Sequence, residues 1–151
     1  MSPGAPVGLN QRWRLYKYGP TDVFRLHSDG SWPGSQADPA GGAVVRDAYG
    51  DRWSQLTVLL YLDDDYYGGE TTFLVDSDGR AASPRGGRAP PESELRGVRV
   101  SARGSVLCFF HGEHALSPLH EGSQLTRGVK HIVRSDVLYM LRGAEQPKDE
   151  L

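Results

Sequence analysis

The sequence predicts an all-β fold, a double-stranded β-helix or jelly roll, and three observations lead to this prediction. The chain has 151 residues, which suffices for one domain with one modest core. It contains 19 glycines and 10 prolines, too many for a chain built of long helices. About eight short runs rich in Val, Ile, Leu, Tyr and Phe alternate with Gly, Pro or Asp, and no convincing helix lies between them. We therefore expect a single domain over residues 1–151, with its core at about 11–142.

The predicted strands follow one another along the chain, each bounded by turn residues. They cover residues 12–18, 23–28, 56–62, 71–75, 97–101 and 105–110, with two more within 119–125 and 129–141. Two long connections, 30–54 and 76–96, interrupt this pattern. Connections of that length in a compact domain are usually lids or disordered segments.

Composition narrows the range of functions. The chain has 17 basic and 19 acidic residues, a net charge of −2, so it has no basic field to hold nucleic acid or an anionic membrane. A small-molecule or protein substrate is favoured instead. Cys108 is the only cysteine, which excludes an intrachain disulfide and a cysteine-based zinc cluster. Its apolar neighbours predict a small buried hydrophobe.

Targeting signals leave the location of the chain open. No apolar run approaches the roughly 18 to 20 residues of a transmembrane helix, and the first ten residues do not resemble a signal peptide. A soluble chain is expected. The last four residues, 148–151, read Lys-Asp-Glu-Leu, which is the ER-retention signal. This ending indicates either a longer precursor of the ER lumen or a coincidence in a charged tail.

A histidine and a carboxylate are predicted on one face of the strand at 23–28. Alternation places Arg25, His27 and Asp29 on one face, with Phe24 and Leu26 on the other. By itself this pair also fits a polar, solvent-facing strand end. Two histidines and one carboxylate, however, hold the metal of non-haem Fe(II) oxygenases and leave further positions on it open. A second histidine with suitable neighbours would therefore point to a metal site.

Four other histidines are candidates, and ligand spacing alone does not choose among them. If the open positions hold 2-oxoglutarate, the far carboxylate of that molecule needs a buried cation on an adjacent strand. Only His120 has such a residue ten positions later, Lys130. His111 and His114 are interpreted as loop residues or as groups that support the ligands, and His131 has no such partner.

Three stretches occur in an order that is typical of one family. They are YKYGPTDVFRLHSDG at 16–30, LTVLLYLDDDYYGGETTF at 56–73 and LHEGSQLTRGVKHIVRSDVLYM at 119–140. In these stretches the chain resembles the prolyl 4-hydroxylase-type Fe(II)- and 2-oxoglutarate-dependent dioxygenases. The resemblance implies that His27, Asp29 and His120 hold the iron. It also implies that Lys130 pairs with the far carboxylate of 2-oxoglutarate.

The resemblance implies roles for three more side chains. The hydroxyl of Tyr61 would bond the same carboxylate, Thr71 would line the same pocket, and Tyr18 would lie near the co-substrate or the substrate. Ordinary strand aromatics are the alternative for both tyrosines.

Two arginines face inward by the same alternation, and a buried guanidinium needs a partner. They are Arg25 and Arg134. Arg134 would contact substrate or co-substrate, or else pair with Asp136 or with a carboxylate from a loop.

The activity implied is hydroxylation of a substrate carbon, with O2 consumed and 2-oxoglutarate converted to succinate and CO2. Ascorbate commonly restores the iron in this family. A peptidyl proline is the first substrate implied, although another protein side chain or a small metabolite would need the same residues. The long connections at 30–54 and 76–96 are expected to close over the site. One alternative is a jelly-roll binding module with an inactive triad. Another is demethylation of nucleic acid by the same chemistry, which the acidic charge balance disfavours.

The chain departs from the family pattern in two places. Family members usually have a helical segment that buttresses one sheet before the first strand, whereas only about ten residues precede the strands here. Helical support is therefore expected to be largely absent, which would expose apolar surface. A fragment, a minimal version of the fold and half of an oligomer are the alternatives, and the oligomeric state stays open. The residue after Lys130 is His131 rather than the tryptophan of the collagen-type enzymes, so collagen-like substrates are not implied.

Overall fold

The computed structural model describes residues 4–81, 94–98 and 102–141, and every regular element within them is a strand. The all-β prediction is confirmed. The described strands are β1 (Pro6–Leu9), β2 (Arg14–Tyr18), β3 (Phe24–His27), β4 (Arg52–Tyr61), β5 (Tyr67–Gly68), β6 (Thr71–Val75), β7 (Glu94–Val98), β8 (Val106–Phe110), β9 (His120–Gly122), β10 (Leu125–Arg127) and β11 (Lys130–Met140).

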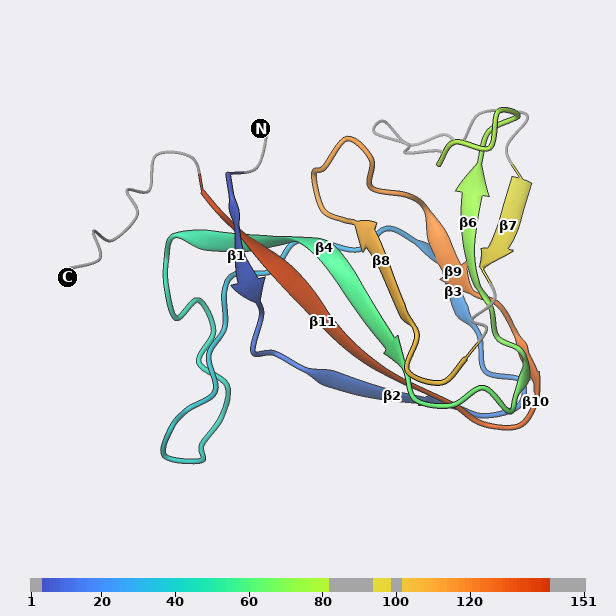
Figure 1. The fold of residues 1–151 in the computed structure, drawn as a ribbon, viewed down its shortest axis with the longest axis horizontal. Coiled ribbons are helices and arrows are strands. Elements are labelled where there is room, and N and C mark those ends of the chain that lie inside the picture. Colours follow the sequence, from blue (N-terminus) through green and yellow to red (C-terminus); the bar gives the residue numbers. More distant parts are fainter. Residues whose placement is uncertain (1–3, 82–93, 99–101, 142–151) are drawn as a thin grey trace.

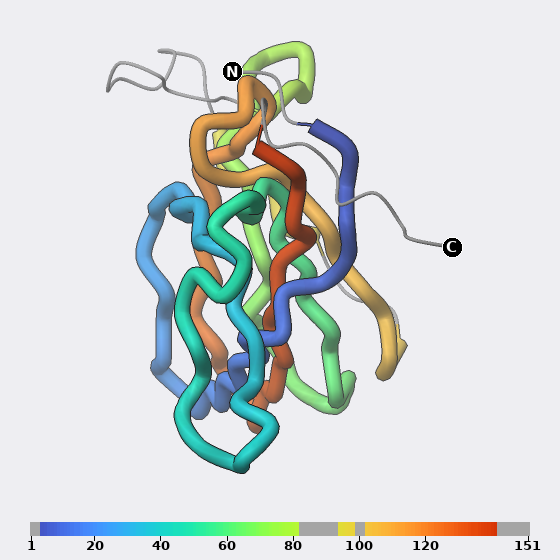
Figure 2. Tube along the Cα trace, turned by 90° about the vertical axis from the view of Figure 1, so that its left-hand side faces the viewer, coloured from blue at the N-terminus to red at the C-terminus, as the bar shows by residue number. Residues whose placement is uncertain are grey.

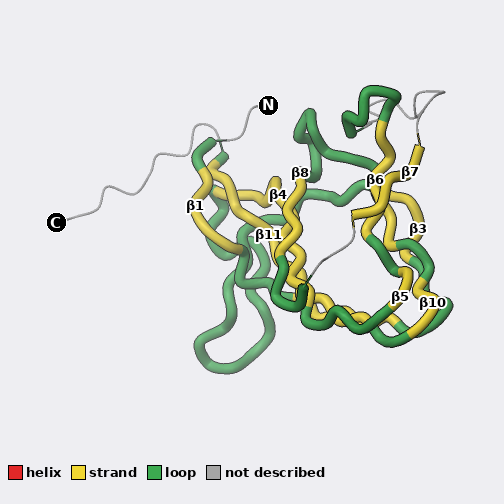
Figure 3. The backbone as a smooth tube through the Cα atoms, turned by 45° about the vertical axis from the view of Figure 1, so that its right-hand side comes forward, coloured by secondary structure: helices red, strands yellow, loops and turns green. Residues whose placement is uncertain are grey.

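Two antiparallel sheets stand opposite each other, as in a jelly roll (Figures 1 and 3). The larger sheet has the order β1-β11-β4-β8, and β2 pairs with a second stretch of β11. The smaller sheet has the order β3-β9-β6-β7, and the short strands β10 and β5 pair separately. Strands far apart in the sequence are thus neighbours, so residues from both ends of the chain can meet between the sheets.

The core lies between the two sheets. Leu59, Tyr61, Phe109 and Ile132 are buried there, from β4, β8 and β11. Each of these side chains alternates with more exposed neighbours, as expected of strands that present one face to a core. Burying side chains of this size contributes roughly 1.5 to 3 kcal/mol each. Partly buried residues of both sheets complete this cluster, namely Tyr16, Tyr18, Phe73 and Leu107.

Most predicted strands are present with ends shifted by a few residues, but the strand predicted within 119–125 is divided into β9 and β10, and β1 and β5 were missed. The sequence of β1 is Pro-Val-Gly-Leu, a composition that does not favour a strand. It forms at the edge of the sheet because it pairs with residues 137–139 of β11. The strand predicted at 97–101 is seen as β7, which begins earlier, and residues 99–101 lie outside the described part.

The connection between β3 and β4 protrudes as a hairpin-like loop (Figure 2). The backbones of Gln36 and Val45 exchange hydrogen bonds of 3.1 and 2.9 Å within it. The loop lies on the side of β1, away from β6 and β7 (Figure 1). In the second long connection, residues 82–93 lie outside the described residues, as does the Lys-Asp-Glu-Leu ending.

The prediction that Cys108 is buried was wrong. β8 is an edge strand of the larger sheet, and its alternation points Leu107 and Phe109 inward and Val106 and Cys108 outward. The same outer face includes Leu15, which is 68% exposed. Apolar surface is therefore exposed on this sheet. Within the described ranges we find no helical segment that could span a bilayer.

Candidate metal centre

The pairing of β3 with β9 brings two histidines together. His27 and His120 are directly opposite in the antiparallel register, and Asp29 follows two residues after β3 ends. Ligand atoms of the three side chains all lie within 4.8 Å of one another. The Nε2 atoms of His27 and His120 lie 3.4 and 3.7 Å from the two oxygens of Asp29. The structure thus brings together the three residues that the sequence suggested as metal ligands.

A bulge in β3 overturns the prediction that Arg25 faces inward. The register of β3 against β9 shifts between Phe24 and His27. An extra residue on one strand inverts the alternation beyond it. Consequently the Phe24 ring lies on the His27 side, with ring centroids 4.2 Å apart, while Arg25 is exposed.

Hydrogen bonds orient both imidazole rings. His27 Nδ1 donates to the carbonyl of Arg25 at 2.7 Å, and His120 Nδ1 donates to the carbonyl of Pro118 at 3.3 Å. Because a carbonyl only accepts, Nδ1 carries a proton in both rings, and in the neutral form of each ring Nε2 keeps a lone pair. His27 Nε2 is buried and has no hydrogen-bond partner among the described residues. Two such lone pairs beside a carboxylate fit a divalent metal ion.

Asp29 is buried, and both of its oxygens accept hydrogen bonds. Arg134 Nη1 donates to Oδ1 and Thr57 Oγ1 donates to Oδ2, each at 2.8 Å. Burial alone would raise the pKa of Asp29, but nearby His27 and the charge of Arg134 outweigh it and hold the pKa well below its usual range. Burial lowers the pKa of His120. The carboxylate is therefore ionised and His120 is neutral near pH 7, the forms that bind metals.

Of the alternatives for Arg134, the structure shows the pair with a loop carboxylate. That carboxylate is Asp29 itself, and Arg134 Nη2 lies 3.6 Å from Asp136 Oδ1 as well. Arg134 also lines a pocket that opens between the two sheets.

This pocket has a volume of about 600 Å³, a figure that includes solvent at its mouth. Asp29, His120, Thr71 and Lys130 line it, so two of the three candidate metal ligands share one space with the lysine. None of residues 30–54, all of which are described, lines this pocket, so the expected closure of that loop over the site is not supported.

The walls of the pocket are largely aromatic and apolar, with Tyr16, Tyr18, Phe24, Leu59, Phe109 and Ile132.

Lys130 is a buried cation at this pocket. It is 4% exposed, and its ammonium group donates to the carbonyl of Gly69 and lies 5.2 Å from the centroid of the Tyr61 ring. No carboxylate among the described residues forms an ion pair with it. Burial lowers the pKa of Lys130 to about 8. A buried ammonium facing a pocket without an ionic partner suits an anionic ligand.

The other predicted side chains gather near Lys130. The Tyr61 hydroxyl lies 2.8 Å from Thr71 Oγ1, and the Tyr18 ring centroid lies 5.8 Å from Lys130 Nζ. Thr71 and Tyr18 line the pocket. Tyr61 is almost fully buried in the core cluster and meets the pocket through Thr71, so its contact with a co-substrate stays a prediction.

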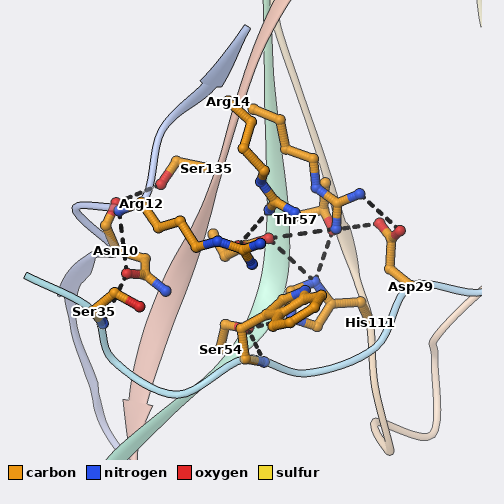
Figure 4. A network of polar contacts seen from close by, with 12 residues as sticks. Asn10, Arg12, Arg14, Asp29, Ser35, Ser54, Thr57, His111 and Ser135 are labelled. Carbon is orange, nitrogen blue, oxygen red and sulfur yellow. Dashed lines mark hydrogen bonds and ion pairs between the residues drawn. The ribbon is translucent and has the colours of Figure 1, made fainter. Parts of the chain in front are cut away.

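Sequence reasoning did not find the role of Thr57. Its hydroxyl joins Asp29 to the fully buried His111, as the close-up in Figure 4 shows. The available signal was a polar residue at an inward-facing position of an apolar strand. His114 and His131 lie elsewhere, with the first stacked on Phe110 and the second hydrogen-bonded to Asp63 at 2.6 Å.

Comparison with protein-family models and with curated proteins gives no match. Among solved structures, the chain is similar to viral collagen prolyl hydroxylase from Paramecium Bursaria Chlorella virus-1, crystallised as its 2OG complex. The sequence identity is 16% and the TM-score 0.43, over 88% of this chain and 63% of that chain. The chain therefore spans less than two thirds of that protein. Its function is inferred from the residues of the site rather than from this likeness.

Proposed function

We propose that the chain is an Fe(II)- and 2-oxoglutarate-dependent dioxygenase of the prolyl 4-hydroxylase type. One observation supports this above all: Asp29 and His120, which form a cluster with His27, line the same pocket as Lys130. Two histidines and one carboxylate form the ligand set of non-haem Fe(II) oxygenases. A buried lysine at the same pocket suits the far carboxylate of a dicarboxylate co-substrate.

Each residue would then have a defined task. When bound, the iron together with 2-oxoglutarate and O2 supplies the oxidant that replaces a substrate C–H by C–OH, with succinate and CO2 as the other products. His27, Asp29 and His120 would hold the iron through one face and leave the other open. Lys130 would pair with the far carboxylate of 2-oxoglutarate, and the hydroxyl of Thr71 would lie beside it. These contacts would fix the co-substrate relative to the metal.

The pocket walls would exclude water from the reacting groups. Leu59, Phe109 and Ile132 are buried at the pocket, and packed apolar side chains leave no room for bulk solvent. Arg134 compensates the charge of Asp29 from the same strand as Lys130. The metal ligand is therefore kept ionised in a largely apolar environment.

For the substrate we propose a peptidyl proline, with another protein side chain or a small metabolite as alternatives. The aromatic rings of Tyr16, Tyr18 and Phe24 line the pocket and provide contact area for a ring of that size. Ascorbate is the proposed reductant for iron oxidised without substrate. The net charge of −2 argues against a nucleic-acid substrate.

The test is 2-oxoglutarate turnover by the purified protein. With Fe(II) and O2 it should release succinate, whereas His120→Ala should release none and His114→Ala, outside the cluster, should retain turnover. Lys130→Ala should bind metal but lose affinity for 2-oxoglutarate. Absence of succinate from a folded, iron-loaded sample would favour the jelly-roll binding module instead. A gain of one oxygen atom in a member of a candidate peptide library would identify the substrate.

A further inference from the structure

Thr57 is a buried hydroxyl whose full hydrogen-bonding capacity is used. It lies on β4 in the larger sheet and is 0% exposed. Its Oγ1 atom lies 2.8 Å from Asp29 Oδ2, 2.7 Å from His111 Nδ1 and 3.5 Å from Arg134 Nη2. A threonine hydroxyl donates one hydrogen bond and accepts two, so these three contacts satisfy it completely.

The direction of each hydrogen bond is set by its partners. An ionised carboxylate only accepts, so the Thr57 proton points to Asp29 Oδ2. Thr57 Oγ1 must then accept from His111 Nδ1, which therefore bears a proton. Burial lowers the pKa of His111, so the ring is neutral and its Nε2 is an acceptor.

Ser54 continues the chain on the far side of His111. Its Oγ lies 2.8 Å from His111 Nε2 and accepts from the backbone N–H of Trp32 at 2.9 Å. In the hydrogen bond with Trp32, Ser54 Oγ is the acceptor, so the hydroxyl proton of Ser54 remains available for donation to His111 Nε2. The hydrogen bonds thus all point the same way, from Trp32 through Ser54, His111 and Thr57 to Asp29. Figure 4 shows Ser54, His111, Thr57 and Asp29 of this chain.

We propose that Thr57 and His111 are positioning residues for Asp29, and that this directed hydrogen-bond chain fixes the orientation of its carboxylate for metal binding. The inference rests on the proposed function, because Asp29 is there a metal ligand. Groups that hydrogen-bond a ligand fix its orientation, and their loss typically weakens metal binding 10- to 100-fold. Arg134 holds the other oxygen, so the two donors together define the carboxylate plane.

The opposite arrangement of protons is unfavourable. With the His111 proton on Nε2, Thr57 would have to donate to Nδ1, and two lone pairs would face each other between Thr57 and Asp29 at 2.8 Å. Asp136 offers no substitute, because its Oδ1 lies 3.8 Å from His111 Nδ1, beyond hydrogen-bond distance. The geometry therefore selects one tautomer of His111.

The first test uses the unmodified, metal-free protein. Two-bond proton–nitrogen correlation spectra of isotope-labelled protein distinguish the two neutral tautomers of each histidine. The expected result for His111 is a protonated Nδ1 and an unprotonated Nε2. A His111 ring with its proton on Nε2 would overturn the proposal without any substitution.

The second test compares two substitutions at position 57 by titrating the protein with Mn2+, a redox-stable stand-in for Fe(II). Thr57→Val keeps the shape but removes the hydroxyl, and we expect the Mn2+ dissociation constant to rise by 10-fold or more, whereas Thr57→Ser should stay within about 3-fold of wild type. Thermal unfolding without metal shows whether each variant is folded. Equal weakening by both variants, or by neither, would contradict the proposed role of the hydroxyl.

The two tests separate the failure of this inference from that of the proposed function. If wild-type protein and Thr57→Val bind Mn2+ equally well, the positioning role is refuted and the metal site stands. Wild-type protein that binds no Mn2+ would refute the metal site, and with it the role of Thr57 and His111 toward a metal. A His111 tautomer as expected would then show that the hydrogen-bond chain serves the fold alone.

Discussion

His27 and His120 face each other across the paired strands β3 and β9, with ring centroids 4.3 Å apart and each Nδ1 bonded to a backbone carbonyl. The register of two backbone strands therefore sets the spacing of the two nitrogen ligands. Asp29 completes the cluster from the loop that comes after β3. The site is thus preorganised, so a metal ion should bind without large rearrangement of the chain.

A preorganised site predicts stabilisation by metal. A ligand that binds only the folded state adds about 2.7 kcal/mol to the free energy of unfolding at 100 times its dissociation constant. Mn2+ should accordingly raise the thermal midpoint of the wild-type protein in differential scanning fluorimetry. His27→Ala should abolish the shift, while His114→Ala, outside the cluster, should keep it. An equal shift in His27→Ala would place the metal elsewhere.

Replacement of Lys130 by methionine should stabilise the metal-free protein. The pKa of Lys130 falls from 10.5 to about 8 on folding, because burial penalises the ammonium form. Below about pH 8 this penalty is of order 3 kcal/mol, offset by about 1 kcal/mol for the hydrogen bond to Gly69 that the variant loses. Urea unfolding at pH 7 should show a gain of about 2 kcal/mol for Lys130→Met. The exposed Lys17→Met is the control and should change little, and a loss in Lys130→Met would contradict the argument.

Binding of 2-oxoglutarate should weaken at alkaline pH. The ammonium form of Lys130 is needed to pair with a carboxylate, and in the folded protein it is lost as the pH rises through about 8. The affinity of the Mn2+-loaded protein should be constant below that pH and approach a tenfold fall per pH unit above it. Isothermal titration between neutral and alkaline pH checks this. Lys130→Arg, which stays charged throughout, should show no such fall, and a parallel fall there would assign the effect to another group.

The residues of the metal cluster could be predicted from the sequence because His27 and Asp29 form a local pattern, and because Lys130 and the family resemblance single out His120. His27 and Asp29 lie two residues apart, and Lys130 comes ten residues after His120. The position of Arg25 could not be predicted, since the bulge in β3 depends on how β9 pairs with it. Strand alternation holds only while the register is regular.

The support of Asp29 could not be predicted for a similar reason. Thr57 and His111 lie far apart in the sequence, and they meet because β4 pairs with β8, whose end carries His111. The burial of Cys108 was misjudged because apolar neighbours do not reveal that β8 is an edge strand. Pairings between distant strands thus decide what a strand-by-strand reading leaves open.

Two leucines of the larger sheet should differ sharply in their contribution to stability. Leu59 is 6% exposed at the pocket, whereas Leu15 is on the outer face. Leu59→Ala should lower the free energy of unfolding by about 2 to 5 kcal/mol, because it removes buried methyl groups and leaves a cavity. Leu15→Ala should change it by less than about 0.5 kcal/mol. Urea unfolding of both variants measures this, and similar losses would mean that the outer face is covered in solution.

Gly112 links the loop after β8 to the metal site. Its N–H donates to the carbonyl of Asp29 at 2.8 Å, its φ is +64°, and an added Cβ would overlap Ser31 Oγ. Gly112→Ala should therefore combine backbone strain with a clash that displaces Asp29, lowering stability by about 2 to 4 kcal/mol and weakening Mn2+ binding.

Gly104→Ala separates these two effects. Gly104 also has a positive φ, +84°, but an added Cβ would meet nothing within 4 Å. That variant should lose only the roughly 1 to 2 kcal/mol of left-handed backbone strain and bind Mn2+ like wild type. Urea unfolding and Mn2+ titration of both variants are the measurements. If Gly112→Ala bound Mn2+ as tightly as Gly104→Ala does, the backbone of Asp29 would not depend on Gly112 for its position.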